Sequence, residues 1–261
     1  MELSYWQKQD QAPLLKDLDW VIPEQKTGDI LVIGGNSQNF LSAVRSSEFL
    51  SNLPFKSVQT LLPDSLKNKI PPLLNIDFAP ATPSGSFDKS ALLESAVQSS
   101  DFNLFIGDFS KNSTTAIALS SAIQNSKKPC LITRDSVDLL TPDIASILSP
   151  NLFILASMSQ LQKIFRALYY PKMILLSMPL LPLLETLHKF SLSYPSTILT
   201  FHSNQIILAK DGKIVTTPIE NTNFTPLSLW GGTLACKIAA LNLWRPTDPL
   251  STTASAILWR P

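Results

Sequence analysis

Glycine is scarce in this sequence, and that scarcity draws attention to the few positions that keep it. Eight glycines stand among 261 residues, about 3% against a typical value of about 7%. Half of them lie in or beside two pairs, Gly34-Gly35 and Gly231-Gly232. Because glycine loses more conformational freedom on folding than any other residue, we expect these pairs where the backbone needs a positive φ or a close approach.

Cysteine, histidine and excess charge are also nearly absent. Cys130 and Cys236 are too few for a disulfide framework and lack the spacing of a zinc site, which predicts a reducing compartment, the cytoplasm. His188 and His202 stand outside any catalytic context, so His-based nucleophilic catalysis is not expected. The 21 basic and 20 acidic side chains form no basic cluster, and we therefore expect no nucleic-acid partner.

Long hydrophobic runs are missing as well. The most apolar window without charge runs from Met173 to Leu184 and contains two prolines; its length of about 12 residues falls short of the roughly 20 that a membrane-spanning helix needs. We assign Lys172–Ser177 to a core strand that leads into a helix. The first residues, Met1 to Trp6, lack the basic and apolar segments of a signal peptide. We expect neither secretion nor a membrane partner.

The stretch from Gly28 to Ser37 is typical of a buried strand, a glycine turn and a helix start. Ile30–Ile33 are β-favouring residues without polar alternation, as in a parallel strand covered on both faces. Gly34 and Gly35 remove Cβ where the chain reverses, and Asn36 or Ser37 can cap the next helix. Free N–H groups and the helix dipole make such a turn a common anion or nucleotide site, although a tight connection without a ligand explains it equally well.

Apolar strands alternate with helical segments along the rest of the chain. Strands are predicted at 57–62, 73–79, 103–108, 129–133, 152–156 and 197–201, and helices at 88–99, 112–125, 157–169, 180–192, 230–241 and 248–259. This alternation predicts an α/β fold in which helices cover both faces of a mostly parallel central sheet. Asp211-Gly212, between apolar runs at 205–209 and 213–216, predicts an antiparallel edge hairpin near the C-terminus. We expect residues 1–27 to form an arm packed over a single domain at 28–261, with a partner contact as the alternative.

Two strands deliver carboxylates near their carboxyl ends. Asp108 closes the strand at 103–108, and Asp135 follows the strand at 129–133. Ligands of open α/β sheets bind at this edge, and carboxylates there can hold a metal on a phosphate; capping of helices is the equally weighted alternative. The loop Pro80–Phe87, with Ser84 and Gly85, either faces a ligand or is a plain crossover.

In this order the landmarks resemble the ribokinase-like superfamily, and within it the ADP- or ATP-dependent NAD(P)H-hydrate dehydratases, over most of the chain. Ile33-Gly34-Gly35 matches the strand and glycine pair with which those enzymes open. Ile106–Lys111 stands where they have Ile-Gly-Pro-Gly-Leu-Gly and keeps the first glycine, and Asp135 matches the second aspartate of Asp-Ala-Asp-Ala-Leu-Asn-Leu. Their Thr-Pro-His-Pro-Gly-Glu segment has no counterpart near Leu155–Gln160. The resemblance implies a three-layer α/β/α ribokinase-like fold.

The last family landmark is Gly-Thr-Gly-Asp before a helix of small residues. Matching Ala235 and Ile238–Leu241 aligns it with Leu229–Gly232. In the family this aspartate is the base that activates a substrate hydroxyl, and the preceding backbone N–H groups stabilise charge on the phosphate. Gly232 stands at the aspartate position, and no Asp or Glu lies between Asn221 and Asn242. Loss of such a base commonly lowers the rate by about 10² to 10⁴.

The resemblance also implies a ligand and its contacts. ADP or ATP with Mg²⁺ is the implied ligand, without a dedicated set of metal-ligating side chains. The implied contacts are Gly231, Gly232, Thr233 and Lys111 for the nucleotide or phosphate, and Gly34, Gly35, Asn36, Ser84, Gly85, Arg134 and Asp138 for the substrate.

Three functions remain open at this point. The first is a divergent, non-catalytic protein that binds a nucleotide or phosphate ligand. The second is an active hydrate dehydratase or small-molecule kinase in which Asp108 or Asp135 replaces the base, with Lys111 or Arg134 on the developing charge. The third is a structural or interaction protein that keeps only the fold, as a homo-oligomer formed through the arm and the apolar tail. The first is our leading hypothesis.

Overall fold

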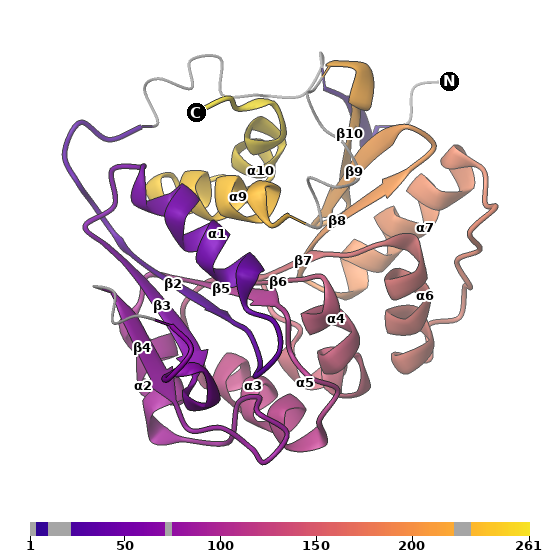
Figure 1. Cartoon of the computed structure of the whole chain (residues 1–261). Helices are drawn as coiled ribbons and strands as arrows, with labels where there is room; N and C mark the ends of the chain where they lie inside the picture. The colour runs from indigo at the N-terminus through magenta and orange to yellow at the C-terminus, as the bar shows by residue number, and fades with distance from the viewer. Residues whose placement is uncertain (1–3, 10–21, 71–74, 222–230) are drawn as a thin grey trace.

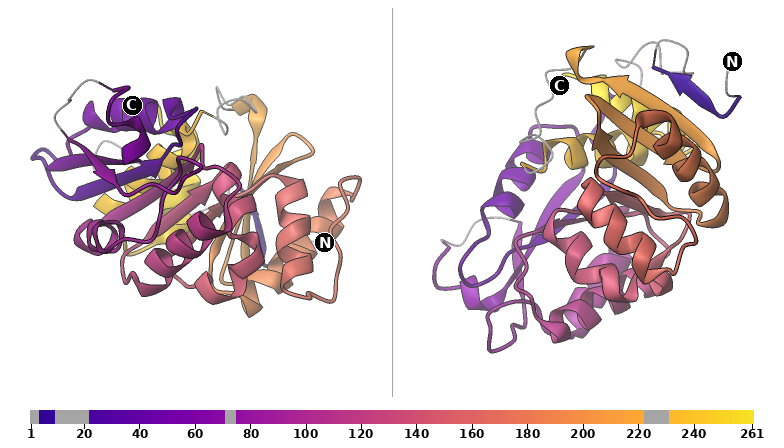
Figure 2. Two further views of the ribbon diagram at one scale, coloured as in Figure 1. Left: turned by 60° about the horizontal axis from the view of Figure 1, so that its bottom comes forward. Right: turned by 90° about the vertical axis from the view of Figure 1, so that its right-hand side faces the viewer.

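One sheet runs through the molecule and helices cover both of its faces (Figures 1 and 2). The computed structural model describes residues 4–9, 22–70, 75–221 and 231–261. Within them the strand order is β1-β10-β9-β8-β7-β6-β5-β2-β3-β4, parallel except where β9 pairs with β8 and with β10. The predicted α/β/α architecture with its antiparallel C-terminal hairpin is confirmed.

The elements follow one another in regular alternation. The strands are β1 Trp6–Lys8, β2 Asp29–Gly34, β3 Ser57–Pro63, β4 Ile76–Ala79, β5 Phe102–Gly107, β6 Cys130–Thr133, β7 Leu152–Leu155, β8 Thr197–His202, β9 Gln205–Lys210 and β10 Lys213–Pro218. The helices are α1 Leu41–Ser51, α2 Ala91–Ser99, α3 Ser113–Asn125, α4 Asp135–Leu140, α5 Ile144–Ile147, α6 Met158–Ala167, α7 Leu180–Ser193, α9 Thr233–Trp244 and α10 Pro249–Leu258, and the 3₁₀ turns are η2 Asp64–Leu66, η3 Thr141–Asp143 and η4 Ile219–Asn221.

The strands divide their side chains between two cores, as their period of two requires. In β2, Leu31 and Ile33 join the cluster under α2 to α7, whereas Ile30 and Val32 join the cluster under α1, α9 and α10. Because both faces are covered, the strands show continuous apolar runs, which is why the sequence predicted them closely. No helix in the described residues has the length and apolar character to cross a membrane.

The two hairpins and the N-terminal strand complete one side of the sheet. Asp211 and Gly212 both have positive φ, 48° and 75°, which matches the right-handed strand twist and confirms the predicted turn. At the outer edge β1 pairs with β10 in parallel, and the Trp6 indole donates to Thr216 Oγ1 at 3.0 Å. The described beginning of the predicted arm is therefore an edge strand; residues 10–21 lie outside the described residues.

The strand predicted at 172–177 is wrong. These residues form turns between α6 and α7, and they have no place in the sheet because β7 pairs directly with β8. Ile174 is buried, but Met173, Leu175 and Leu176 are 69%, 51% and 59% exposed. An apolar run of this length therefore does not by itself indicate a core strand, because most of this one faces solvent.

Candidate functional site

Three parallel strands end together at the edge of the sheet where the sequence placed a site. β2 ends at Gly34, β5 at Gly107 and β6 at Thr133. The Gly35 N–H donates to the Gly107 carbonyl at 3.0 Å, and a Cβ on Gly34 would lie 2.7 Å from the same oxygen. The two backbones therefore approach as closely as only glycine allows, which places the residues after each strand side by side.

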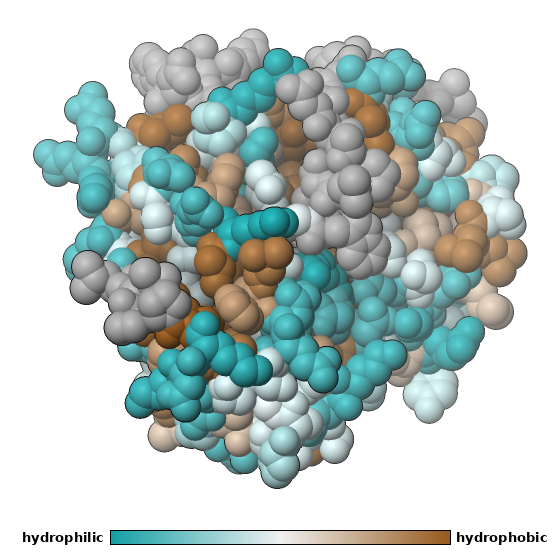
Figure 3. All heavy atoms as spheres, in the orientation of Figure 1, coloured by the Kyte–Doolittle hydropathy of each residue, from teal (hydrophilic) through white to brown (hydrophobic). Residues whose placement is uncertain are grey.

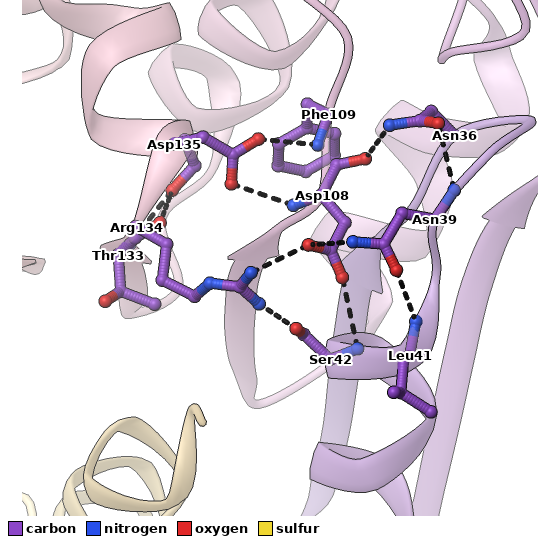
Figure 4. A network of polar contacts seen from close by, with 10 residues as sticks. Asn36, Asn39, Leu41, Ser42, Asp108, Phe109, Thr133, Arg134 and Asp135 are labelled. Carbon is purple, nitrogen blue, oxygen red and sulfur yellow. Dashed lines mark hydrogen bonds and ion pairs between the residues drawn. The ribbon is translucent and has the colours of Figure 1, made fainter. Parts of the chain in front are cut away.

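Asp108 is the hub of this edge (Figure 4). Its carboxylate is 3% exposed. Oδ1 accepts from Asn39 Nδ2 at 3.0 Å and from Arg134 Nη2 at 2.8 Å, while Oδ2 accepts from the backbone N–H of Ser42 at 3.1 Å. Ser42 is in the first turn of α1, so its N–H group has no acceptor within the helix. Asp108, the residue after β5, supplies that acceptor.

The cap predicted for α1 is therefore wrong. The helix starts at Leu41, after residues 36–39 have formed a separate turn. Asn36 Oδ1 accepts from the backbone N–H groups of Gln38 and Asn39, at 2.8 and 3.1 Å, and its amide donates to the Asp108 carbonyl at 2.5 Å. Asn36 thus organises the glycine turn rather than the helix, a common use of asparagine.

Arg134 faces Asp108 from the neighbouring strand end. Its guanidinium is 17% exposed and also donates to the Ser42 hydroxyl, while Nε has no partner within the described residues. Arg134 and Asp108 both have left-handed φ, 58° and 61°. Such a conformation of a non-glycine residue costs on the order of 1–3 kcal/mol and persists only where the surroundings hold it, most often at functional sites.

Asp135 holds the backbone of Asp108 and Phe109 in place. Its two oxygens accept the backbone N–H groups of Asp108 and Phe109, each at 2.8 Å. Burial raises the pKa of this carboxyl, and the bond from Asp108 together with the Arg134 charge opposes that rise only in part. A Cβ on Gly107 would collide with the Asp135 carboxylate, which explains the glycine at that strand end. Both predicted substitute bases are thus engaged in holding the edge together.

The small-residue loop reaches the same edge. The Ser37 N–H donates to the Gly85 carbonyl at 2.8 Å, and Asn112 Nδ2 donates to Ser84 Oγ at 2.7 Å. Asn112 itself caps α3 by accepting from the backbone N–H groups of Thr114 and Thr115, at the start of the helix predicted for residues 112–125. The structure therefore gathers the proposed substrate residues Gly34, Gly35, Asn36, Ser84, Gly85 and Arg134 around Asp108.

A groove of about 780 Å³ opens beside this cluster, between α3 and α4. Lys111, Asp135 and Asp138, all singled out by the sequence, line it. Asp138 is held by Lys163 Nζ at 2.5 Å and Gln160 Nε2 at 2.7 Å, whereas the Lys111 ammonium has no hydrogen bond or ion pair in the described part of the chain. The groove therefore offers a free cation beside the sheet edge.

The glycine pair at the start of α9 lies on the opposite face of the sheet. Gly232 has a φ of 80°, and a Cβ there would lie 2.7 Å from Ser46 Oγ and 3.1 Å from Ile106 Cδ1. The Ser46 hydroxyl is buried and has no partner among the described residues. Ser46 is one turn beyond Ser42 on α1, so the α9 N-terminus and the Arg134 guanidinium approach the same side of one helix.

Sequence reasoning missed the residues that come from helix surfaces. Asn39, Ser42 and Ser46 lie on or just before α1 and belong to no motif, and Gln160 lies on α6. Gln160 was the one with a local signal, because it completes a capping box with Ser157. Its amide also donates to the Arg134 carbonyl at 2.6 Å.

Comparisons with known proteins identify the fold. No protein-family model and no curated protein matches the chain. A protein of Streptococcus mutans described as hypothetical is 17% identical, with a TM-score of 0.65 over 94% of this chain and 87% of that one. The ADP/ATP-dependent NAD(P)H-hydrate dehydratase of Bacillus subtilis, co-crystallised with ATP/Mg²⁺ and soaked with CoA, is 12% identical, with a TM-score of 0.56 over 94% and 86%. The fold is ribokinase-like.

The ribokinase-like fold extends to neighbours that act on quite different molecules. A nucleoside kinase of Methanocaldococcus jannaschii, an archaeal member of the ribokinase family, is 8% identical, with a TM-score of 0.51 over 89% of this chain and 90% of that one. Because identities this low establish the fold alone, function has to be argued from the residues of this chain.

Proposed function

We propose that this ribokinase-like protein binds a nucleotide or a related phosphate ligand at the carboxyl edge of its sheet and does not carry out phosphoryl transfer. The observation that carries the proposal is that the two carboxylates that would have to replace the family base are both occupied by hydrogen bonds. Asp108 and Asp135 each accept hydrogen bonds on both oxygens from groups that hold the edge. A general base needs an oxygen directed at the substrate proton, and using either of these would dismantle the edge.

The backbone conformation of Gly232 helps to decide how the chain aligns with the family motif Gly-Thr-Gly-Asp. A left-handed φ without room for a Cβ suits the glycine that precedes the aspartate better than the aspartate itself. We therefore assign Thr233, the first residue of α9, as the second candidate for the base position. Neither a glycine nor a threonine accepts a proton as a carboxylate does, so both alignments leave the chain without the base.

The N-terminus of α9 and two cationic side chains support phosphate binding. The first N–H groups of α9 and the positive end of its dipole are suited to an anion. The Arg134 guanidinium, with Nε free of partners in the described residues, lies near the same side of α1, and its planar fork suits phosphate oxygens. Lys111 adds a free cation on the other face.

ATP with Mg²⁺, as seen with the Bacillus subtilis dehydratase, fits this donor set in part. The cationic groups and α9 would hold the phosphates. No cluster of three or more His, Cys, Asp or Glu suited to a metal occurs within the described residues. Mg²⁺ would therefore arrive on the phosphates and keep several waters, as it does in many nucleotide sites. The cytoplasm remains the compartment we propose, on cysteine usage.

Thermal shift tests the proposal. Purified protein is melted with ADP, ATP, NADH or NADPH, each with and without Mg²⁺. A ligand at about 100 times its Kd stabilises the folded state by about 2.7 kcal/mol, which corresponds to a rise of several degrees for a chain of this size. The absence of a shift with all four nucleotides would refute ligand binding.

A second measurement separates binding from catalysis. Each nucleotide that stabilises the protein is supplied with hydrated NADH, and the release of NADH is followed by its absorbance. We expect no turnover above buffer. Turnover that disappears in both Asp108→Asn and Asp135→Asn would overturn the non-catalytic assignment and establish the active-enzyme alternative.

A further inference from the structure

The connection between α6 and α7 presents apolar side chains to solvent. Tyr169 is 92% exposed, Met173 69%, Leu175 51% and Leu176 59%, and Leu181, in the first turn of α7, is 53% exposed. Figure 1 draws this connection at the right-hand edge of the molecule, and in the same view Figure 3 shows hydrophobic side chains gathered at that edge. Large apolar residues grouped in this way on a surface mark a contact site.

Cations surround these residues, and their charges remain largely uncompensated. From Ile144 to Leu184 the sequence contains Lys163, Arg166 and Lys172 and no Asp or Glu. Of the acids that flank this stretch, Asp143 lines the groove between α3 and α4 together with Lys163, and Glu185 is paired with Lys189 at 2.6 Å; Asp138 is paired with Lys163 at 2.5 Å. Lys172 lowers the pKa of Glu185 from a distance, but neither Arg166 nor Lys172 has a side-chain hydrogen bond or ion pair in the described residues.

A pocket of about 280 Å³ lies at the base of the same connection. Arg166 and Lys172 line it together with the rings of Phe165 and Tyr170 and the side chain of Met173. A lining that combines two cations with apolar side chains suits a ligand that is anionic at one end and apolar at the other. Leu175 and Leu176 continue the apolar surface away from the pocket.

We propose that the α6–α7 connection docks the protein on an anionic phospholipid membrane, with a lipid phosphate between Arg166 and Lys172 and with Met173, Leu175 and Leu176 inserted among the acyl chains. The surface is an exposed turn region with a tyrosine beside it, a combination that favours the bilayer interface. A two-fold contact between copies would bring Arg166 and Lys172 of both copies together without acids to neutralise them. This surface contact departs from the expectation of no membrane partner, which rested on an apolar run too short for a span and therefore did not address contact with a membrane surface.

Vesicle co-sedimentation tests the proposal with the full chain. Vesicles of phosphatidylcholine alone are compared with vesicles that also contain phosphatidylglycerol, at low and high salt. We expect binding to the anionic vesicles that is at least about tenfold tighter than to the neutral ones and that weakens with salt. Equal binding to both, or no binding to either, would overturn the proposal.

Two surface variants and two controls assign the contact to this connection. Arg166→Glu/Lys172→Glu and Leu175→Ser/Leu176→Ser are each expected to lower vesicle binding at least about tenfold with little change in melting temperature, because Arg166, Leu175 and Leu176 are exposed and the half-buried Lys172 has no hydrogen bond or ion pair among the described residues. Lys127→Glu and Leu192→Ser alter an exposed cation and a 64% exposed leucine elsewhere and should bind as the parent does. Sedimentation velocity without vesicles completes the test: a dimer that dissociates in Leu175→Ser/Leu176→Ser would show that a second copy covers the surface.

Discussion

The Asp108–Arg134 pair differs physically from the other ion pairs among the described residues. At 2.8 Å, with side chains 3% and 17% exposed, it is removed from water, whereas Lys128 and Asp101, at 3.0 Å, are 42% and 43% exposed. Exposed pairs add little because water and salt screen them. A buried carboxylate, in contrast, depends on its partner, since removal of that partner leaves an uncompensated charge.

Truncation of the two cations should therefore have very different effects. Arg134→Ala is expected to lower the free energy of unfolding by about 3–5 kcal/mol, and the matched control Lys128→Ala by about 0–1 kcal/mol. Urea denaturation followed by circular dichroism measures both values. Similar small losses for the two variants would contradict the role we assign to the buried pair.

The two thiols should be inert in the folded protein. Burial raises the pKa of Cys130 and of Cys236 to about 12, and the thiolate is the reactive form. We expect Ellman's reagent at pH 8 to label no thiol in native protein and both after denaturation. Prompt labelling of either cysteine in the native state would contradict this.

The same pKa shift makes stability depend on pH. Above about pH 9 the unfolded chain releases thiol protons that the folded chain retains up to about pH 12. The free energy of unfolding should therefore fall as the pH rises through this window. Urea denaturation at a series of pH values measures the slope, and Cys130→Ala/Cys236→Ala should flatten it.

At the level of single residues, the sequence predicted the site residues that follow strands but not the residues that bind to them. The residues that follow strands, Asp108, Arg134 and Asp135, were predictable because an apolar run ending in a glycine or a polar residue marks a sheet edge. Their partners were not, because Asn39, Ser42 and Gln160 are brought to them by the packing of α1 and α6, which no local pattern encodes. The cap of α1 was predicted wrongly for the same reason: the acceptor, Asp108, is the residue that follows β5.

At the level of secondary-structure elements, α1 and α9 approach each other so closely at Gly232 that there is no room for a Cβ at this position. Gly232→Ala would add both a left-handed alanine and a contact with Ser46 Oγ and Ile106. We expect it to lower the free energy of unfolding by about 2–4 kcal/mol, of which about 1–2 kcal/mol comes from the backbone conformation. Urea denaturation measures the loss.

Two controls separate these causes. Gly212→Ala has a similar φ, 75°, but meets mainly the side chain of the exposed Leu192, and should show the backbone cost alone. Ser46→Ala removes a buried hydroxyl without a described partner, should be near neutral by itself, and should restore part of the stability of Gly232→Ala. A Ser46→Ala/Gly232→Ala variant no more stable than Gly232→Ala would exclude the Ser46 contact as the cause.

Elements buried on both faces were predictable and those at the periphery were not. β2, β5, β6 and β7 are mainly apolar and β8 combines Ile198, Leu199 and Phe201 with β-branched threonine, so their type and their succession along the chain followed from the sequence. Lys172–Ser177 has the same apolar character but lies outside the sheet, and composition cannot distinguish the two settings. Trp6–Lys8 has no strand signature because a short edge strand takes its stability from a partner, β10, that lies far along the chain.

For the whole molecule we predict one cooperative unfolding transition. Each central strand contributes side chains to both hydrophobic clusters, so neither face can lose its helices without exposing the sheet that the other face needs. Urea transitions followed by far-ultraviolet circular dichroism and by tryptophan fluorescence should coincide. Separate midpoints would divide the chain into two domains and contradict the single domain at 28–261.

The pairing of β1 with β10 also orders events during synthesis. Trp6 and its partner Thr216 are separated by 210 positions, which a ribosome adding about 5–20 residues per second covers in roughly 10 to 40 s. Throughout that interval the nascent chain carries an aromatic strand whose place in the sheet does not yet exist. The segment that contains β1 thus reaches its place in the sheet only after β10 has been made, and meanwhile it is available to chaperones.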